Sequence, residues 1–90
     1  MLKPPAVAFL KKLLDTPGPS GYEANAAKAW RDEASTFAAE VHADVHGNSM
    51  AVVNPSGSPT IMLAGHIDEI GVIVTYIDDD GYVYIAPIGG

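Results

Sequence analysis

The most informative stretch of this sequence is Ala64-Gly65-His66-Ile67-Asp68-Glu69-Ile70-Gly71. It follows a compact apolar run at residues 60–64, which predicts a strand buried on both faces of a sheet. His66 and Asp68 are two residues apart, so in an extended chain their side chains point to the same side. Glu69 is expected to point away from both and to make structural contacts. The stretch therefore predicts a histidine paired with an aspartate at the end of a strand, where α/β folds place ligand sites.

A histidine beside an aspartate has two interpretations. When a ring nitrogen binds a metal ion, the other ring N–H is usually held by a carboxylate or a carbonyl. By pattern alone, however, a hydrogen-bonded structural pair is the commoner case. A catalytic zinc ion normally takes three protein ligands, and one histidine with one aspartate falls short of that set. The spacing alone therefore leaves a metal site and a structural pair both open.

Two helices are predicted upstream, joined by a loop rich in proline and glycine. The first covers about residues 4–15, because proline suits a helix start and the apolar positions recur on one face. Pro17-Gly18-Pro19 ends it. Ser20-Gly21-Tyr22-Glu23 has the pattern of a capping box, in which the serine hydroxyl accepts a backbone N–H and the glutamate reaches back to the serine N–H. The second helix is expected to continue to about Ala39.

The remaining segments have the pattern of short strands separated by turns. Strands are predicted at about residues 41–45, 50–53, 70–77 and 82–86. His46-Gly47-Asn48-Ser49 and Asp78-Asp79-Asp80-Gly81 are turn sequences between them. Two helices followed by strands make the predicted fold class mixed α/β.

The charge balance is acidic, with 11 Asp and Glu against 5 Lys and Arg and a formal net charge of −6. This argues against binding to nucleic acid or to an anionic membrane surface, both of which use clustered basic residues. The absence of cysteine excludes disulfides and cysteine-based zinc sites. Met1-Leu2-Lys3-Pro4-Pro5 lacks the pattern of a signal peptide, and no apolar stretch approaches the ~20 residues of a membrane span. We therefore expect a cytoplasmic protein.

Other polar groups have simpler interpretations than a second site. His42 and Asp44 are expected at an exposed strand edge. Asp78-Asp79-Asp80 lacks the spacing of a calcium loop, so a solvated hairpin tip is favoured. The adjacent carboxylates of Asp68 and Glu69 would face opposite ways on a strand, which does not suit a glycosidase. The sequence has neither a phosphate-binding loop motif nor Gly-x-Ser-x-Gly, which disfavours nucleotide binding and serine hydrolase chemistry.

Four segments, in order, resemble the M42 family of metallo-aminopeptidases, the group of glutamyl and deblocking aminopeptidases. The segments are Pro17-Gly18-Pro19-Ser20-Gly21-Tyr22-Glu23, Asp44 with Gly47-Asn48, Ala64-Gly65-His66-Ile67-Asp68-Glu69-Ile70-Gly71, and Gly81-Tyr82 with Pro87-Ile88-Gly89-Gly90. Gly65 stands where many relatives have alanine, which exchanges one small residue for another. The resemblance runs over essentially all 90 residues.

The resemblance implies a fold and a site. Residues 1–70 would be the N-terminal part of the three-layer αβα catalytic domain of a metallo-exopeptidase, and residues 71–90 the incomplete start of a β-rich inserted domain. His66 matches a metal ligand of the family, and Asp68 matches the catalytic-site carboxylate that orients this histidine. The complete enzyme would hold two divalent ions, zinc or cobalt, and would remove N-terminal residues from peptides as a homo-oligomer. The other ligands and the general base would lie downstream.

A non-enzymatic alternative is also open. The 90 residues contain one metal ligand of the family, so this chain by itself would be a truncated piece or a non-catalytic assembly piece. The last predicted strand leads directly to Gly89-Gly90, and we expect the sequence to stop inside the inserted domain. On this basis the 90 residues alone are expected not to bind two metal ions.

Overall fold

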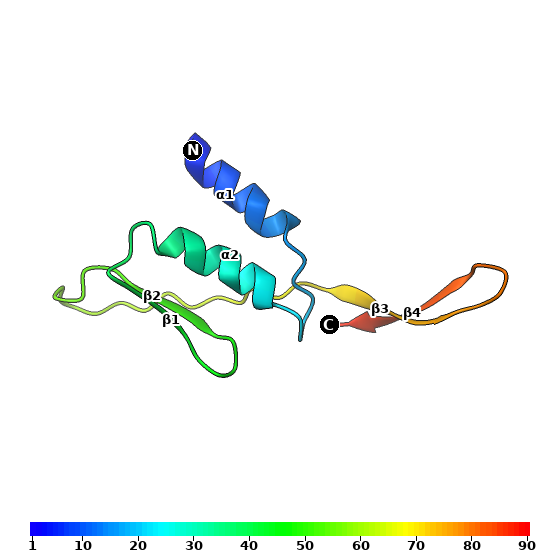
Figure 1. Ribbon diagram of the computed structural model, residues 1–90. Helices are drawn as coiled ribbons and strands as arrows, with labels where there is room; N and C mark the ends of the chain where they lie inside the picture. Colours follow the sequence, from blue (N-terminus) through cyan, green and yellow to red (C-terminus); the bar gives the residue numbers. More distant parts are fainter.

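Two helices form the N-terminal part of the computed structural model, which describes residues 1–90 (Figure 1). α1 spans Pro4–Asp15 and has proline in its first turn, where the missing N–H leaves no hydrogen bond unmade. α2 spans Ala24–Ala34 and contacts α1. The bounds of α1 agree with the sequence prediction. No helix of the structure has both the length and the apolar character required to cross a bilayer.

The start of α2 differs from the predicted capping box. Glu23 occupies the N-cap position, and no side chain caps the helix. The Glu23 carboxylate accepts the N–H of Gly21 rather than that of Ser20. The Ser20 hydroxyl donates to Asp68 instead of accepting a helix N–H. The capping-box prediction is therefore wrong, because Ser20 has a distant partner that a local pattern does not contain.

The end of α2 also comes earlier than predicted, at Ala34. The Ser35 hydroxyl donates to the carbonyl oxygen of Arg31, and the Thr36 hydroxyl donates to that of Glu33. Hydroxyl groups that bond to nearby backbone carbonyls compete with continuation of a helix. Two consecutive residues of this kind account for the shorter helix.

Two antiparallel hairpins follow the helices (Figure 1). β1 (Glu40–Ala43) pairs with β2 (Ser49–Val52), and both strands contact α2. β3 (Gly71–Ile77) pairs with β4 (Val83–Ile88), and this second hairpin extends away from the helices. Each strand begins and ends within two residues of its predicted bounds. The mixed α/β class is confirmed.

Residues 60–64 do not form the predicted buried strand. They lie on the long irregular segment that joins β2 to β3 in Figure 1, and neither sheet includes them. Ile61, Met62 and Leu63 are 78%, 85% and 93% exposed. A strand buried on both faces needs paired neighbours and a covering layer on each side. These 90 residues supply neither, so each sheet has two strands and the three-layer αβα arrangement is not formed among them.

The buried side chains lie on α2, at Ala26, Ala27, Ala29 and Ala34. Only 5 of the 90 residues are buried. The radius of gyration is 17.3 Å, whereas a compact domain of this length has a value of ~12 Å. Large apolar side chains therefore stay exposed along α1 and along both strands of the second hairpin.

The loop between the helices docks on the segment before β3. The Glu69 N–H donates to the Gly18 carbonyl (2.9 Å), and the Ser20 N–H donates to the Glu69 carbonyl (3.3 Å). The two bonds form a short parallel bridge between Pro19 and Glu69. A Cβ added to Gly71 would lie 2.8 Å from the Cβ of Pro19. The close approach of the two segments therefore requires a glycine at this position.

We expect Gly71→Ala to destabilise the fold by about 1–3 kcal/mol, the usual cost of overpacking, because the new methyl group would overlap with Pro19. Gly65→Ala is the matched control, since a Cβ at Gly65 meets nothing within 4 Å. Chemical denaturation followed by circular dichroism measures the free energy of unfolding of both variants. Equal stabilities would show that the loop does not dock against β3 in this way.

Asp44 organises the turn between β1 and β2. Its Oδ1 accepts the backbone N–H groups of His46 (2.9 Å) and Asn48 (3.0 Å), and its Oδ2 accepts the side-chain amide of Asn48 (2.8 Å). The side-chain hydrogen bond from Asn48, with the backbone donors of Asn48 and His46, holds the pKa of Asp44 below its ordinary value. His42 is exposed on β1, as predicted, whereas Asp44 lies beyond the strand and holds the turn together.

We expect this turn to weaken in acid. The folded-state pKa of Asp44 lies below its value of about 4 in an unfolded chain. The ionised carboxylate therefore contributes stability that is present above pH ~4 and is lost as the pH falls through the folded-state pKa. Asp44→Asn should lower the melting temperature at neutral pH and flatten its fall between about pH 4 and pH 2.

The control for this variant is Asp79→Asn, because Asp78 rather than Asp79 accepts the hydrogen bonds of the second turn. Melting temperatures measured by calorimetry across the acid range compare the two variants with the wild type. A wild-type pH dependence in Asp44→Asn would contradict the role given to this carboxylate.

Candidate functional site

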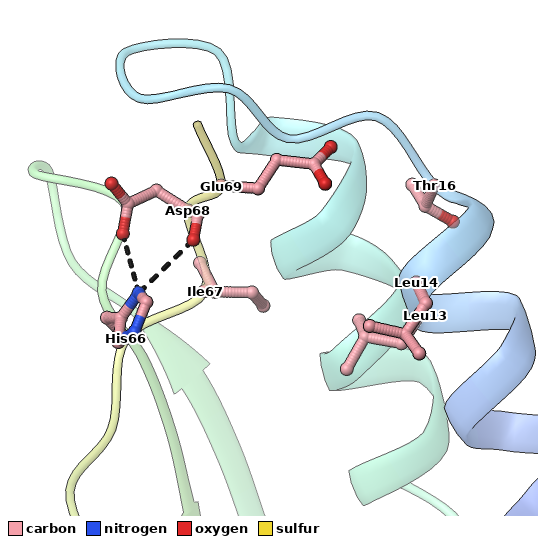
Figure 2. Close-up of a pocket in the computed structure, with 7 residues that line it drawn as sticks. All are labelled: Leu13, Leu14, Thr16, His66, Ile67, Asp68 and Glu69. Carbon is pink, nitrogen blue, oxygen red and sulfur yellow. Dashed lines mark hydrogen bonds and ion pairs between the residues drawn. The ribbon is translucent and has the colours of Figure 1, made fainter. Parts of the chain in front are cut away.

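His66 and Asp68 contact each other directly (Figure 2). Nδ1 of His66 lies 2.9 Å from Oδ1 of Asp68 and 3.2 Å from the backbone oxygen of Asp68. Both partners are acceptors, so Nδ1 carries the proton and donates it. In the neutral ring Nε2 then carries the lone pair, and the histidine side chain is 85% exposed. The structure thus brings the predicted pair together and leaves one ring nitrogen free to bind a ligand.

Asp68 is held from its other side by Ser20. The Ser20 hydroxyl donates to Oδ2 of Asp68 at 2.5 Å, across 48 positions of sequence. The hydrogen bond from Ser20, and next the one from His66, lower the pKa of the Asp68 carboxyl below its ordinary value. Asp68 therefore stays ionised at neutral pH with one oxygen on each partner. Sequence reasoning missed Ser20 at this site, because its only local signal was the pattern of a helix cap.

Glu69 has the structural contact that was predicted for it. Its Oε1 accepts the N–H of Gly18 at 3.0 Å, and its side chain points away from His66 and Asp68 (Figure 2). A small pocket of about 190 Å³ lies between residues 66–69 and the end of α1, where Leu13, Leu14 and Thr16 line it. Glu69 thus lines this pocket, and its carboxylate binds the loop between α1 and α2.

The donor atoms of this site fit one ligand position of a metal ion. An exposed Nε2 on an imidazole whose Nδ1–H is held by a carboxylate is the usual arrangement of a metal-binding histidine. Both oxygens of Asp68 are already engaged, by His66 and by Ser20. The structure contains no group of three or more His, Cys, Asp or Glu side chains that could enclose a metal ion. A complete catalytic metal site, with three protein ligands, therefore needs ligands from outside these 90 residues.

Comparison with known proteins identifies the family. Residues 47–90, which include the His66 motif, match the family model of the M42 glutamyl aminopeptidases. The chain is 42% identical over 83 residues to a lysyl aminopeptidase of Pyrococcus furiosus. It is also 42% identical over 82 residues to a putative aminopeptidase of Acetivibrio thermocellus, and each alignment covers 91% of this chain. The chain belongs to the M42 family.

One solved structure is similar to nearly the whole chain. The M42 chain superposes on a TET aminopeptidase from a marine sediment archaeon of the Thaumarchaeota with a TM-score of 0.82 and 31% identity, over 96% of its own length. It spans 24% of that protein and 24% of each of the two curated relatives. The resemblance over nearly all of the sequence is therefore confirmed, and the roles of His66 and Asp68 stay predictions.

We expect the contact between Glu69 and Gly18 to depend on an acceptor oxygen and not on charge. Glu69→Gln keeps that oxygen, whereas Glu69→Ala removes it. Hydrogen exchange of the Gly18 amide should be about 5-fold faster in Glu69→Ala, as expected for a hydrogen bond worth ~1 kcal/mol, and unchanged in Glu69→Gln. If both variants exchange like the wild type, Glu69 does not hold the loop.

Proposed function

We propose that this chain forms the part of an M42 metallo-aminopeptidase that carries a metal ligand, His66, and its orienting carboxylate, Asp68. The observation that carries the proposal is the bond from Nδ1–H of His66 to Asp68, which leaves Nε2 exposed to solvent. The similarity to proteins named as aminopeptidases supplies the reaction class, which is hydrolysis of the N-terminal residue from a peptide.

In this proposal each residue of the chain has a defined part. His66 provides one nitrogen ligand to one of two divalent ions, zinc or cobalt. Bound ions of this kind polarise the scissile carbonyl and lower the pKa of a water molecule. Asp68 keeps the proton of the imidazole on Nδ1, so that the lone pair of Nε2 points outward. The other ligands and the general base are proposed to lie elsewhere in the protein, because the chain spans about a quarter of the length of its relatives.

The exposed apolar surface supports the same arrangement. We propose that residues 1–70 belong to the three-layer αβα catalytic domain and that residues 71–90 begin a β-rich inserted domain. Ile61, Met62 and Leu63 are largely exposed, and so are most apolar side chains of β3 and β4. Surfaces of this extent favour a cover of further protein. A cytoplasmic homo-oligomer that acts on peptide substrates fits this composition and family.

The second candidate is a non-catalytic piece of such an enzyme. The absence of a three-ligand group among these residues favours it for a polypeptide that consists of these 90 residues alone. Such a polypeptide would not hold two metal ions and would not hydrolyse peptides. Metal content and turnover of the protein at its natural length therefore distinguish the two candidates.

We expect His66→Ala to remove one of the two metal ions from the protein at its natural length. Turnover of an aminoacyl p-nitroanilide should fall by at least about 100-fold, because a metal ion contributes several kcal/mol to stabilisation of the transition state. His42→Ala is the matched control, since His42 is exposed on β1 and its side chain makes no hydrogen bond or ion pair. Elemental analysis after dialysis gives the metal content. Unchanged metal content and turnover in His66→Ala would exclude this histidine from the site.

A further inference from the structure

Three side chains form a continuous chain of hydrogen bonds at the site. The Ser20 hydroxyl donates to Oδ2 of Asp68, and Oδ1 of the same carboxylate accepts the Nδ1–H of His66. Ser20 comes from the loop between α1 and α2, whereas the other two residues come from the segment before β3. The histidine is thus connected through Asp68 to a different part of the fold.

The position of the Ser20 hydroxyl is restricted by its surroundings. The Ser20 N–H donates to the carbonyl of Glu69 (3.3 Å), which places the residue beside the segment that carries Asp68. A Cβ added to Gly89 would lie 3.1 Å from Oγ of Ser20, so the glycine after β4 lies close to the hydroxyl and leaves room for it. Ser20 is therefore held between the end of the second hairpin and Asp68.

A carboxylate needs such a partner if it is to orient a ring. The last torsion of an aspartate side chain is broad, so it does not by itself fix the plane of the carboxylate relative to the histidine ring. The imidazole of His66 is 85% exposed, and packing contacts contribute little to its orientation. The hydrogen bonds must therefore supply the orientation, and the bond from Ser20 fixes the oxygen that does not face the ring.

Resting on the proposed function, we propose that Ser20 is a positioning residue for the metal-binding histidine. By holding Oδ2 of Asp68, it directs Oδ1 to Nδ1 of His66 and so keeps the lone pair on Nε2. The hydroxyl is not needed to start α2, because Glu23 occupies the N-cap position of that helix. Removal of the hydroxyl therefore acts on the histidine rather than on the helix.

The test is the tautomer of His66 in Ser20→Ala. The protein at its natural length, with ¹⁵N-labelled histidine and without metal, is measured by NMR above the pH at which imidazole titrates. In the wild type we expect the ring proton on Nδ1. In Ser20→Ala we expect the ¹⁵N shifts to move toward the mixed tautomers of a free histidine. Unchanged shifts in a folded Ser20→Ala variant would overturn the proposal.

If Ser20→Ala does not fold, Ser20→Thr and Ser20→Val provide the test, because threonine and valine side chains have the same shape. Ser20→Thr keeps the hydroxyl and Ser20→Val replaces it by a methyl group, so only Ser20→Thr should keep the wild-type tautomer. If the two give the same shifts, the proposal fails. Thr36→Ala is the control for a lost hydroxyl, because the Thr36 hydroxyl donates only to the backbone carbonyl of Glu33 in the last turn of α2. It should leave the His66 shifts unchanged.

A zinc titration separates this proposal from the proposed function. With Zn²⁺ and a competing chromophoric chelator, Ser20→Ala should weaken binding about 10-fold, the lower end of the range for residues that orient a metal ligand, and Ser20→Thr should restore it. A shifted tautomer in Ser20→Ala with zinc binding unchanged in both Ser20→Ala and His66→Ala would support the positioning role and exclude His66 as a ligand. Weaker zinc binding in His66→Ala with a wild-type tautomer in Ser20→Ala would support His66 as a ligand and exclude the positioning role of Ser20.

Discussion

The contact between residues 18–20 and Glu69 holds the two parts of this chain together. Two backbone hydrogen bonds, the bond from the Gly18 N–H to the Glu69 carboxylate, and the bond from Ser20 to Asp68 all form there. The segments are about 50 positions apart, so bringing them together has an entropic cost. The entropic cost of closing this loop applies once, and the closed loop then allows several hydrogen bonds to form. The helices and the first hairpin lie on one side of this contact, and β3 and β4 lie on the other (Figure 1).

Small residues make this contact possible. A Cβ at Gly18 would lie 3.1 Å from the Cβ of Ala26 on α2, and one at Gly71 would overlap with Pro19. The alanine face of α2, the loop and the segment before β3 can therefore approach one another closely. The hydrogen bond between Ser20 and Asp68 follows from this backbone packing, because the loop brings Ser20 within reach of the carboxylate. The histidine itself has little packing around it and is oriented by its bonds.

Much apolar surface remains exposed in this structure. With 5 of 90 residues buried, these elements do not enclose a core of their own. A segment such as residues 60–64 gains the stability of a buried strand only when neighbouring strands pair with it and helices cover it. The same missing layers would carry further metal ligands in the proposed enzyme. In the proposed enzyme, the exposed apolar surface and the lack of further metal ligands would thus have one physical origin.

The amino-acid sequence by itself determined the features that depend on near neighbours. The first helix follows from apolar periodicity and its prolines, and both hairpins follow from turns that Asp44 and Asp78 stabilise with bonds to residues two and four positions away. The meeting of His66 with Asp68 follows from a spacing of two. Only the tertiary structure decided the partner of Ser20 and the state of residues 60–64. The first needs a contact across 48 positions and the second needs strands to pair with, and neither is contained in a local pattern.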